Sequence, residues 1–142
     1  GRISQGIQSK LTLGNLEAFR DWGFAGDYVK GMYQMMQHEK PDDWVLSSDE
    51  THTVKEFVKI AFECVNLNWE DYVVTSKKYE RPNEVEHLLG DSTKARTKLN
   101  WTPEVSFKEL VEMMVVSDIK EATREKVLLD QNLIKPTWEN PA

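Results

Sequence analysis

Residues 14–28 read GNLEAFRDWGFAGDY, and this stretch decides how the remainder of the chain is interpreted. It contains Gly14, Gly23 and Gly26, and glycine tolerates positive φ and lets backbone segments approach closely. The stretch is therefore predicted to be a shaped loop rather than a regular element. Arg20 lies inside this loop and offers a rigid fork of donors that suits a carboxylate or a phosphate. Because a helix is predicted to follow directly, the turn is a candidate anion site.

On both sides of this loop, short apolar runs alternate with segments of helical periodicity. Strands are predicted at residues 11–13, 44–46 and 72–74. Helices are predicted at residues 25–38, from residue 53, at residues 92–99, and from residue 106 to beyond residue 121. The remaining segments are predicted to be mostly irregular, with an extended piece left open at residues 85–88 and an irregular tail from residue 131. Strands that alternate with helices indicate the α/β fold class.

Two of the predicted helices begin with the spacing of a capping box. Thr53 is followed three residues later by Glu56, and Ser106 is followed by Glu109. In this arrangement the two side chains accept hydrogen bonds from amide groups that the first helical turn leaves open. Both helix starts are therefore predicted with a physical reason beyond periodicity.

Two features of the helices are interpreted as structural rather than functional. Met32, Met35 and Met36 form a stripe at helical spacing, which is predicted to face the core. Cys64 is the single cysteine and falls within a predicted helix, where a packed thiol is expected rather than a reactive one.

The composition excludes several classes of function. At 142 residues, with 39% hydrophobic and 30% charged residues, the chain is long enough for one domain with a core. A net charge of −6 argues against binding of nucleic acid, which needs clustered lysine and arginine. No apolar run approaches the roughly 20 residues that cross a bilayer, so no membrane partner is expected. One cysteine cannot form an internal disulfide, which fits a reducing, cytoplasmic setting.

A second candidate site is the loop motif RPNE at residues 81–84. Pro82 biases Arg81 toward an extended conformation, so that its guanidinium group is free to donate to a phosphate. Glu84 follows three positions later and is suited to accept hydrogen bonds from sugar hydroxyls. Each candidate also has a simpler interpretation, in which Arg20 and Arg81 form solvated surface ion pairs of little energetic weight.

Several signatures of catalysis are missing from this sequence. It contains neither a G-x-G-x-x-G loop nor a P-loop that would hold the phosphates of a cofactor. None of the four tyrosines is followed four residues later by a lysine, and no pair of histidines has metal-ligand spacing. No catalytic, cofactor-binding or metal-binding residue is therefore assigned.

The chain is also expected to be part of a larger protein. Three short strands are few for a free-standing doubly wound sheet, and the sequence begins with Gly1-Arg2-Ile3 rather than with methionine. Residues 1–142 are interpreted as a single region that functions together with another part.

Taken together, the motifs of this chain resemble the C-terminal half of GDP-mannose 4,6-dehydratases, which are extended short-chain dehydrogenases. The resemblance rests on segments in the same order as in that family: LGNL at 13–16, RDWG at 20–23, DYV at 27–29, ETH at 50–52, RPNEV at 81–85, LGD at 89–91 and LNWTP at 99–103. The R-D turn and the R-P loop occur across the superfamily, whereas their combination with the other segments is more specific to this dehydratase.

The resemblance implies an enzyme that binds NADP in an N-terminal Rossmann domain and converts GDP-mannose to GDP-4-keto-6-deoxymannose, the precursor of GDP-fucose. The family's cofactor loop and catalytic residues have no counterpart in this chain, so no cofactor is expected for the chain alone and it is predicted to be inactive by itself. The matched residues Arg20, Arg81 and Glu84 are implied to bind the nucleotide diphosphate and the hydroxyls of GDP-mannose.

Two positions depart from the family pattern and leave the fine substrate preference open. Phe24 stands where the family usually has histidine or tyrosine, and Gly26 replaces the usual lysine. The expected partners are GDP-mannose, the missing N-terminal Rossmann domain and a second copy of the chain. The alternatives left open are a stand-alone, non-catalytic module for sugar-nucleotide binding or assembly, and a fragment of another nucleotide-sugar epimerase or dehydratase.

Overall fold

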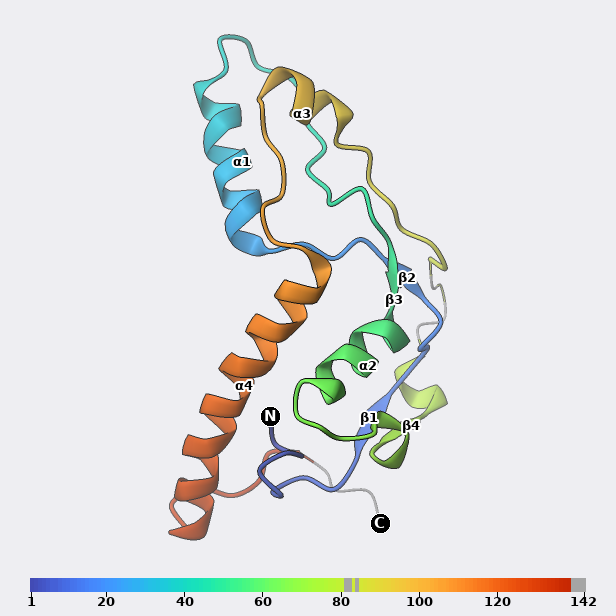
Figure 1. Cartoon of the computed structure of the whole chain (residues 1–142), viewed down its shortest axis with the longest axis vertical. Coiled ribbons are helices and arrows are strands. Elements are labelled where there is room, and N and C mark those ends of the chain that lie inside the picture. Colours follow the sequence, from blue (N-terminus) through green and yellow to red (C-terminus); the bar gives the residue numbers. More distant parts are fainter. Residues whose placement is uncertain (81–82, 84, 139–142) are drawn as a thin grey trace. The chain divides into compact units, whose positions relative to one another are not determined.

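The computed structural model describes residues 1–80, 83 and 85–138 (Figure 1). Its described part is an α/β structure with four helices and four very short strands, as expected. The helices are α1 (Ala25–Gln37), α2 (Val54–Glu63), α3 (Thr93–Lys98) and α4 (Phe107–Asp130). The strands are β1 (Leu11–Leu13), β2 (Phe19–Arg20), β3 (His52–Thr53) and β4 (Val73–Thr75). Two single 3-10 turns, η1 (Trp69–Asp71) and η2 (Lys77–Tyr79), flank β4.

The chain divides into two compact units, each assembled from segments that are distant in the sequence. Unit 1 comprises Gly1–Leu16, Lys55–Pro82 and Val111–Ala142, and unit 2 comprises Glu17–Val54 and Asn83–Leu110. In the part of the chain that the structure covers, none of the helices combines the length and the apolar character that a membrane crossing requires.

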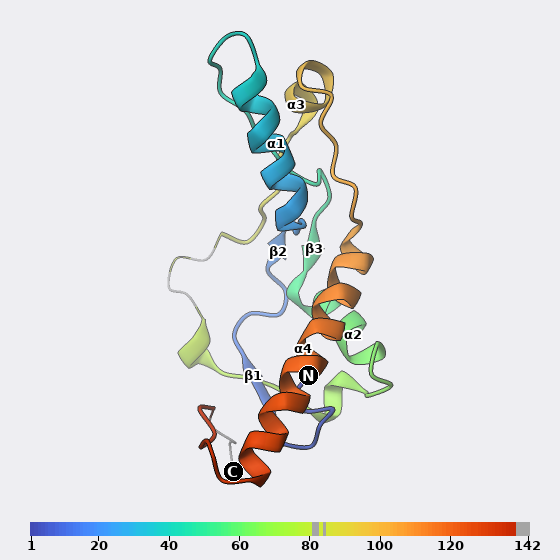
Figure 2. The same ribbon diagram turned by 90° about the vertical axis from the view of Figure 1, so that its left-hand side faces the viewer.

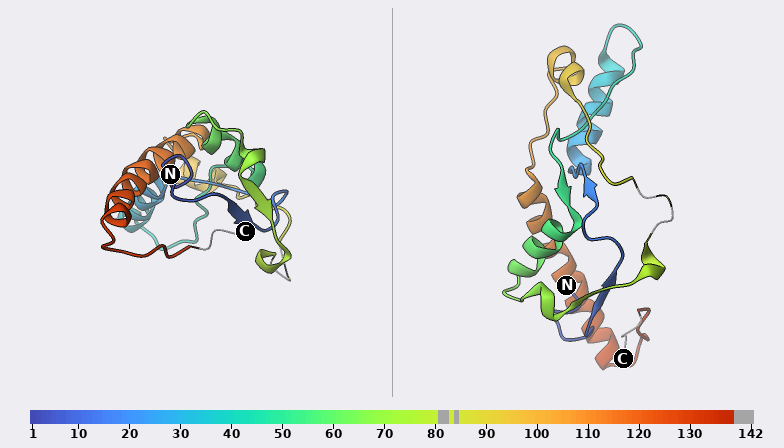
Figure 3. Two further views of the ribbon diagram at one scale, coloured as in Figure 1. Left: turned by 90° about the horizontal axis from the view of Figure 1, so that it is seen from below. Right: turned by 90° about the vertical axis from the view of Figure 1, so that its right-hand side faces the viewer.

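Unit 1 is organised around a parallel pair of strands. β1 pairs with β4 in the register Leu11 with Val73 through Leu13 with Thr75, and Figure 3 shows the dark blue β1 near the yellow-green β4. The predictions of strands at residues 11–13 and 72–74 are thereby confirmed. Gly14, directly after β1, lies against the backbone carbonyl of Tyr79, where an added Cβ would collide with that oxygen. This glycine is needed for close backbone approach.

The core of unit 1 lies on one face of each of its two long helices. Val58 and Phe62 of α2 are buried, and so are Val111, Val115 and Ala122 of α4. The intervals of four and seven residues place each set on a single helical face. The periodicity that predicted these helices therefore also predicted the faces that they bury.

Unit 2 contains an antiparallel pair with a third segment alongside it. β2 pairs with β3, with Phe19 opposite Thr53 and Arg20 opposite His52, and Figure 2 shows these two strands side by side. On the other side of β2, the Phe19 amide donates to the Glu86 carbonyl at 2.8 Å and the Leu88 amide donates to the Phe19 carbonyl at 3.3 Å. The extended piece left open at residues 85–88 is thereby confirmed, whereas the prediction that the whole stretch before α1 is loop is wrong at β2. A strand of two residues is too short to show alternation in the sequence.

The core of unit 2 includes a buried carboxylate, Asp27, in the first turn of α1. Its side chain is 1% exposed, and Oδ2 accepts hydrogen bonds from the amides of Glu104 at 2.9 Å and Val105 at 3.0 Å. The Asp27 carbonyl accepts from Nε1 of the buried Trp101 at 2.7 Å. Tyr28 stacks on Trp101 with ring centroids 6.0 Å apart. α1 is therefore fixed at its N-terminus by hydrogen bonds rather than by apolar contact alone.

The predicted helix boundaries hold closely. The second capping box is confirmed, since the Glu109 carboxylate accepts from the Ser106 amide at 2.9 Å and from its hydroxyl at 2.6 Å. α3 ends just before Asn100, which adopts a positive φ of 54°. α2 begins immediately after Thr53, as expected, and the described tail from Gln131 contains no helix or strand.

Three structural interpretations of the sequence are wrong. Residues 44–46 are not a strand, because within the described residues no strand lies beside them. Met32 and Met36 are 57% and 81% exposed, because α1 turns Asp27 and the tightly packed Gly31 inward. Cys64 lies in an exposed turn just after α2.

We predict that Val111→Ala destabilises the protein by about 2 kcal/mol, because Val111 of α4 is 0% exposed and its truncation leaves a cavity in the core. The measurement is urea unfolding followed by circular dichroism. Val116→Ala in the same helix is the matched control, because Val116 is 54% exposed and should change the free energy of unfolding by less than about 0.5 kcal/mol. Equal effects of the two substitutions would contradict the assigned core face of α4.

Candidate functional site

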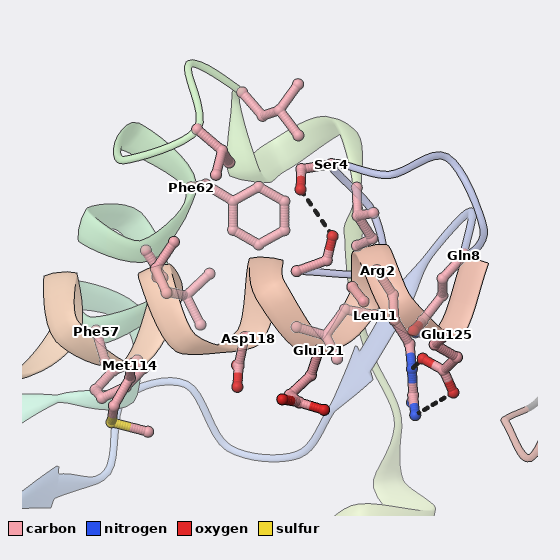
Figure 4. A pocket seen from close by; sticks show the side chains of 18 residues that line it. Arg2, Ser4, Gln8, Leu11, Phe57, Phe62, Met114, Asp118, Glu121 and Glu125 are labelled. Atoms are coloured by element: carbon pink, nitrogen blue, oxygen red, sulfur yellow. Dashed lines mark hydrogen bonds and ion pairs between the residues drawn. The ribbon is translucent and has the colours of Figure 1, made fainter. Parts of the chain in front are cut away.

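A pocket of about 460 Å³ opens in unit 1 between α2, α4 and the N-terminal residues (Figure 4). Most of its wall is apolar and includes Leu11, Phe57, Phe62, Val65 and Met114. Its charged side chains are three carboxylates from α4, namely Asp118, Glu121 and Glu125, together with Arg2, and Ser4 and Gln8 add neutral polar groups. The volume is large enough for a small molecule, so the charges of the polar groups decide which ligands it suits.

Those charges do not suit a diphosphate. Arg2 is already engaged, because its Nε and Nη2 donate to the two oxygens of Glu125 at 2.7 and 3.1 Å and its guanidinium lies 4.1 Å from the centre of the Trp138 ring. The amino group of Gly1 lies near Asp118, and burial is the main cause that lowers its pKa. With three carboxylates and a paired arginine, the pocket would repel two phosphate groups. The predicted anion site is therefore sought in unit 2.

Arg20 is placed by its position in β2, between β3 and residues 85–88. Its Nη1 donates to the Phe19 carbonyl at 2.6 Å and to the Val85 carbonyl at 2.8 Å. His52 is its direct partner across the antiparallel pair, so the two side chains leave the same face of the sheet. Arg20 is therefore a half-buried arginine held by backbone oxygens beside the segment that follows the RPNE motif.

Asp21, the next residue, is bonded to the segments on both sides of β2. Its Oδ1 accepts from the Ser48 amide at 2.9 Å and from the Ser48 hydroxyl at 2.6 Å, and Oδ2 accepts from the Gly90 amide at 3.2 Å. An added Cβ at Gly90 would collide with the side chain of Ser47. One carboxylate thus links β2 to the loop before β3 and to the loop before α3.

A second carboxylate, Asp49, extends this network. It accepts from Ser47 Oγ at 2.6 Å, from the amide and hydroxyl of Ser92 at 2.8 and 2.7 Å, and from Arg96 Nε at 2.8 Å. Burial by itself would raise the pKa of Asp49, but these hydrogen bonds and the charge of Arg96 outweigh it and lower the pKa from 3.8 to about 2. Arg96 Nη2 also donates to the Ser48 carbonyl at 3.3 Å, which joins the two carboxylate networks.

Among the described residues, the titratable side chains near Arg20 include His52 and Tyr28. The His52 ring stacks on Phe107 at 3.9 Å between centroids, with Nε2 3.7 Å from a Glu50 oxygen. Burial, followed by the charges of nearby carboxylates that include Asp21, raises the pKa of Tyr28 above 10.0. A tyrosine used as a base at neutral pH needs the opposite shift. Within the described ranges, no three metal-ligating side chains gather at one place.

The structure places one of the three predicted site residues. Arg20 lies as described above, whereas Arg81 and Glu84 fall outside the described residues. Sequence reasoning missed the role of Asp21 as a partner of two loops. The one available signal was its position directly after Arg20, which does not reveal partners that are 27 and 69 residues away.

Comparison with known proteins gives a consistent family match. The family model described as GDP-mannose 4,6 dehydratase matches residues 1–114. GDP-mannose 4,6 dehydratase 1 of Arabidopsis thaliana is 56% identical over 130 residues, which cover 92% of this chain and 36% of that protein. The human GDP-mannose 4,6 dehydratase is 43% identical over 84% of this chain and 37% of its own length. The chain thus spans little more than a third of the length of these relatives.

Solved structures share the fold over a similar fraction. The structure of RMD from Pseudomonas aeruginosa complexed with NADPH aligns with a TM-score of 0.71 at 18% identity, over 82% of this chain and 38% of that chain. UDP-glucose 4-epimerase from Thermotoga maritima with UDP-glucose aligns with a TM-score of 0.65 at 26% identity, over 89% of this chain and 38% of that chain.

We predict that the contribution of Asp49 to the free energy of unfolding depends on pH and is lost in acid. Because its pKa is lowered from 3.8 to about 2 on folding, the contribution is present above pH 3.8 and is lost as the pH falls through 2. Thermal unfolding from pH 5 to pH 2 should show a smaller loss of stability in Asp49→Asn than in the wild type. Asp130→Asn, at the exposed end of α4, is the control and should retain the wild-type slope. A wild-type slope in Asp49→Asn would refute the assignment.

Proposed function

The chain belongs to the GDP-mannose 4,6 dehydratase family, and on this premise we propose that it provides the part of such an enzyme that binds GDP-mannose. The whole of residues 1–142 is proposed to serve as this single C-terminal substrate-binding region. The observation that carries the proposal is the position of Arg20, which lies on β2 with its guanidinium bonded to the carbonyl of Val85, the residue after the RPNE motif.

The proposed role of these residues is to bind and orient the substrate. A GDP-sugar brings two negatively charged phosphates and several hydroxyl groups, which arginine and glutamate are suited to bind. We assign the diphosphate to Arg20 and Arg81 and the hydroxyl groups to Glu84. Neutralising the diphosphate in this way would hold the hexose in one orientation for the reaction.

The chain's own residues do not fit the family's cofactor. NADP supplies hydride transfer when it is bound, and its phosphates are normally held at a helix N-terminus that follows a glycine-rich turn. α1 follows β2 and has Asp27 in its first turn, and α2 follows β3 and has Glu56 in its first turn. A carboxylate at either place would repel a phosphate group. The sequence contains no glycine-rich dinucleotide motif. We therefore assign cofactor binding and the lyase chemistry to another part of the enzyme and propose that this chain alone is inactive.

The partner that we propose for unit 2 is the Rossmann domain of the same enzyme. α1 presents exposed apolar side chains at helical spacing, namely Val29, Met32, Tyr33 and Met36. Residues 44–46 are apolar and lie outside the helices and strands of the described part of the chain. An exposed apolar helix face beside an apolar segment of this kind is a surface that a neighbouring domain would cover. We also propose that two copies of the chain can associate through this face. The proposed location of the protein is the cytoplasm.

A second candidate is binding of a different nucleotide sugar. It is favoured by the likeness to UDP-glucose 4-epimerase from Thermotoga maritima, which exceeds a quarter identity over most of this chain. A stand-alone, non-catalytic binding module would use the same residues. Competition between GDP-sugars and UDP-sugars for binding shows which base the site prefers and so separates the two nucleotide sugars. A reading frame upstream of Gly1 that encodes a cofactor domain would favour an enzyme part over a stand-alone module.

We predict that titration calorimetry detects binding of GDP-mannose to this chain. The affinity for UDP-glucose should be weaker by about tenfold or more. Arg20→Ala and Arg81→Ala should each weaken the binding of GDP-mannose by about tenfold or more, because each removes a charge-assisted hydrogen bond. Arg124→Ala is the matched control, since Arg124 is exposed on α4 and pairs only locally with Glu121 among the interactions described.

Two results would contradict this proposal. Equal affinity for GDP-mannose and UDP-glucose would favour the second candidate. Unchanged affinity in Arg20→Ala and Arg81→Ala would remove both arginines from the site. If the isolated chain binds neither ligand, the same substitutions are measured in a full-length dehydratase that carries this sequence, where the KM for GDP-mannose should rise while NADP binding stays normal.

A further inference from the structure

We propose that Asp21 is the positioning residue for Arg20, and that it acts by fixing both neighbours of β2 through one carboxylate. The inference rests on the proposed role of Arg20 in binding the diphosphate. Asp21 itself is assigned no contact with the substrate.

The first step concerns what holds the guanidinium of Arg20. Nη1 donates to two backbone carbonyls, those of Phe19 and Val85, at 2.6 and 2.8 Å. The Phe19 carbonyl lies in the same strand as Arg20, but Val85 lies 65 residues further along the chain. The orientation of Arg20 therefore depends on keeping residues 85–88 beside β2.

The second step concerns what keeps those residues in place. Two backbone hydrogen bonds join Phe19 to this segment, and beyond it the Gly90 amide donates to Asp21 Oδ2 at 3.2 Å. Gly90 accepts no side chain, because an added Cβ would collide with Ser47. Asp21 is thus the side chain that fastens the far end of the segment onto the strand that carries Arg20.

The third step concerns the opposite side of β2. Oδ1 of Asp21 accepts from both the amide and the hydroxyl of Ser48, at 2.9 and 2.6 Å. Ser48 is fixed in turn, because its carbonyl accepts from Arg96, whose Nε is paired with Asp49 at 2.8 Å. The loop that leads into β3 is therefore a firm anchor, and the two oxygens of Asp21 connect this anchor to Gly90 across the strand.

The geometry provides a substitution that breaks one of these connections selectively. In Asp21→Asn the amide oxygen can still accept from Ser48, but the amide nitrogen would face the Gly90 N–H, where two donors cannot bond. Ser48→Ala removes the hydroxyl and leaves its backbone amide in place, so the Gly90 connection survives. Asp43→Asn is the control, because Asp43 is an exposed aspartate of the same unit.

The first measurement needs no ligand. Amide hydrogen exchange by NMR should be about tenfold faster at Gly90 and Leu88 in Asp21→Asn than in the wild type, since both amides depend on the fastened segment. The separate Nη signals of a restrained Arg20 should merge as its guanidinium rotates freely. The Leu11 amide, bonded to Tyr72 in unit 1, should exchange at the wild-type rate in Asp21→Asn. All four signals, those of Gly90, Leu88, Arg20 and Leu11, should be unchanged in Asp43→Asn. Unchanged Leu88 exchange and unchanged Arg20 signals would overturn the inference.

The second measurement is a double-mutant cycle for binding of GDP-mannose. Asp21→Asn should weaken binding by about tenfold in the wild type and by less than about twofold in the Arg20→Ala background, because its effect passes through Arg20. Equal effects in both backgrounds would show that Asp21 supports the unit in general and would overturn the inference. If the isolated chain binds no GDP-mannose, the cycle is measured as the KM of a full-length dehydratase that carries this sequence; if Arg20→Ala leaves that KM unchanged, the proposed function fails, while the exchange rates and the Arg20 signals still decide whether Asp21 positions Arg20.

Discussion

The arrangement of unit 2 around β2 depends on the hydrogen bonds that the Asp21 carboxylate accepts from Ser48 and Gly90. β2 contains two residues, and a pair of strands that short provides too few backbone hydrogen bonds to hold three distant chain segments together. The two oxygens of Asp21 add three hydrogen bonds at this point, to Ser48 on one side and to Gly90 on the other. The arrangement of Arg20 follows from this constraint, because its guanidinium reaches a carbonyl of the segment that Asp21 helps to fix.

Carboxylates serve the same purpose at other places in this unit. Asp27 binds two amides of the segment before α4, and Asp49 joins Ser47, Ser92 and Arg96. A charged oxygen forms stronger hydrogen bonds than a neutral one, and several donors around it offset the cost of burial. Part of the chain's net charge of −6 is therefore structural. In unit 1 the carboxylates instead surround a pocket, and the same sign of charge there disfavours phosphates.

The sequence predicted the elements whose signals are local. Helix boundaries followed from the capping box at Ser106 and Glu109 and from residues such as Asn100, and β1 and β4 followed from short apolar runs. Periodicity showed that α1 has an apolar stripe but could not show which side faces inward, because Gly31 and Asp27 are not recognisable as core residues from their types. The strand expected at residues 44–46 failed because a strand needs a neighbour. Arg20 was identified through its motif, whereas its connection to Val85 and the partners of Asp21 depend on tertiary structure; Arg81 and Glu84 remain predictions.

The outward stripe of α1 has a chemical consequence of its own. A methionine with most of its side chain in solvent, such as Met36 at 81% exposure, is open to oxidants, and its sulfoxide is polar and chiral. Met32 lies one turn earlier on the same face. Two added oxygen atoms would thus make the exposed face of α1 more polar, while the inward side with Asp27 and Gly31 would keep its contacts. Oxidation during storage would then reduce the tendency of this helix face to associate with another apolar surface.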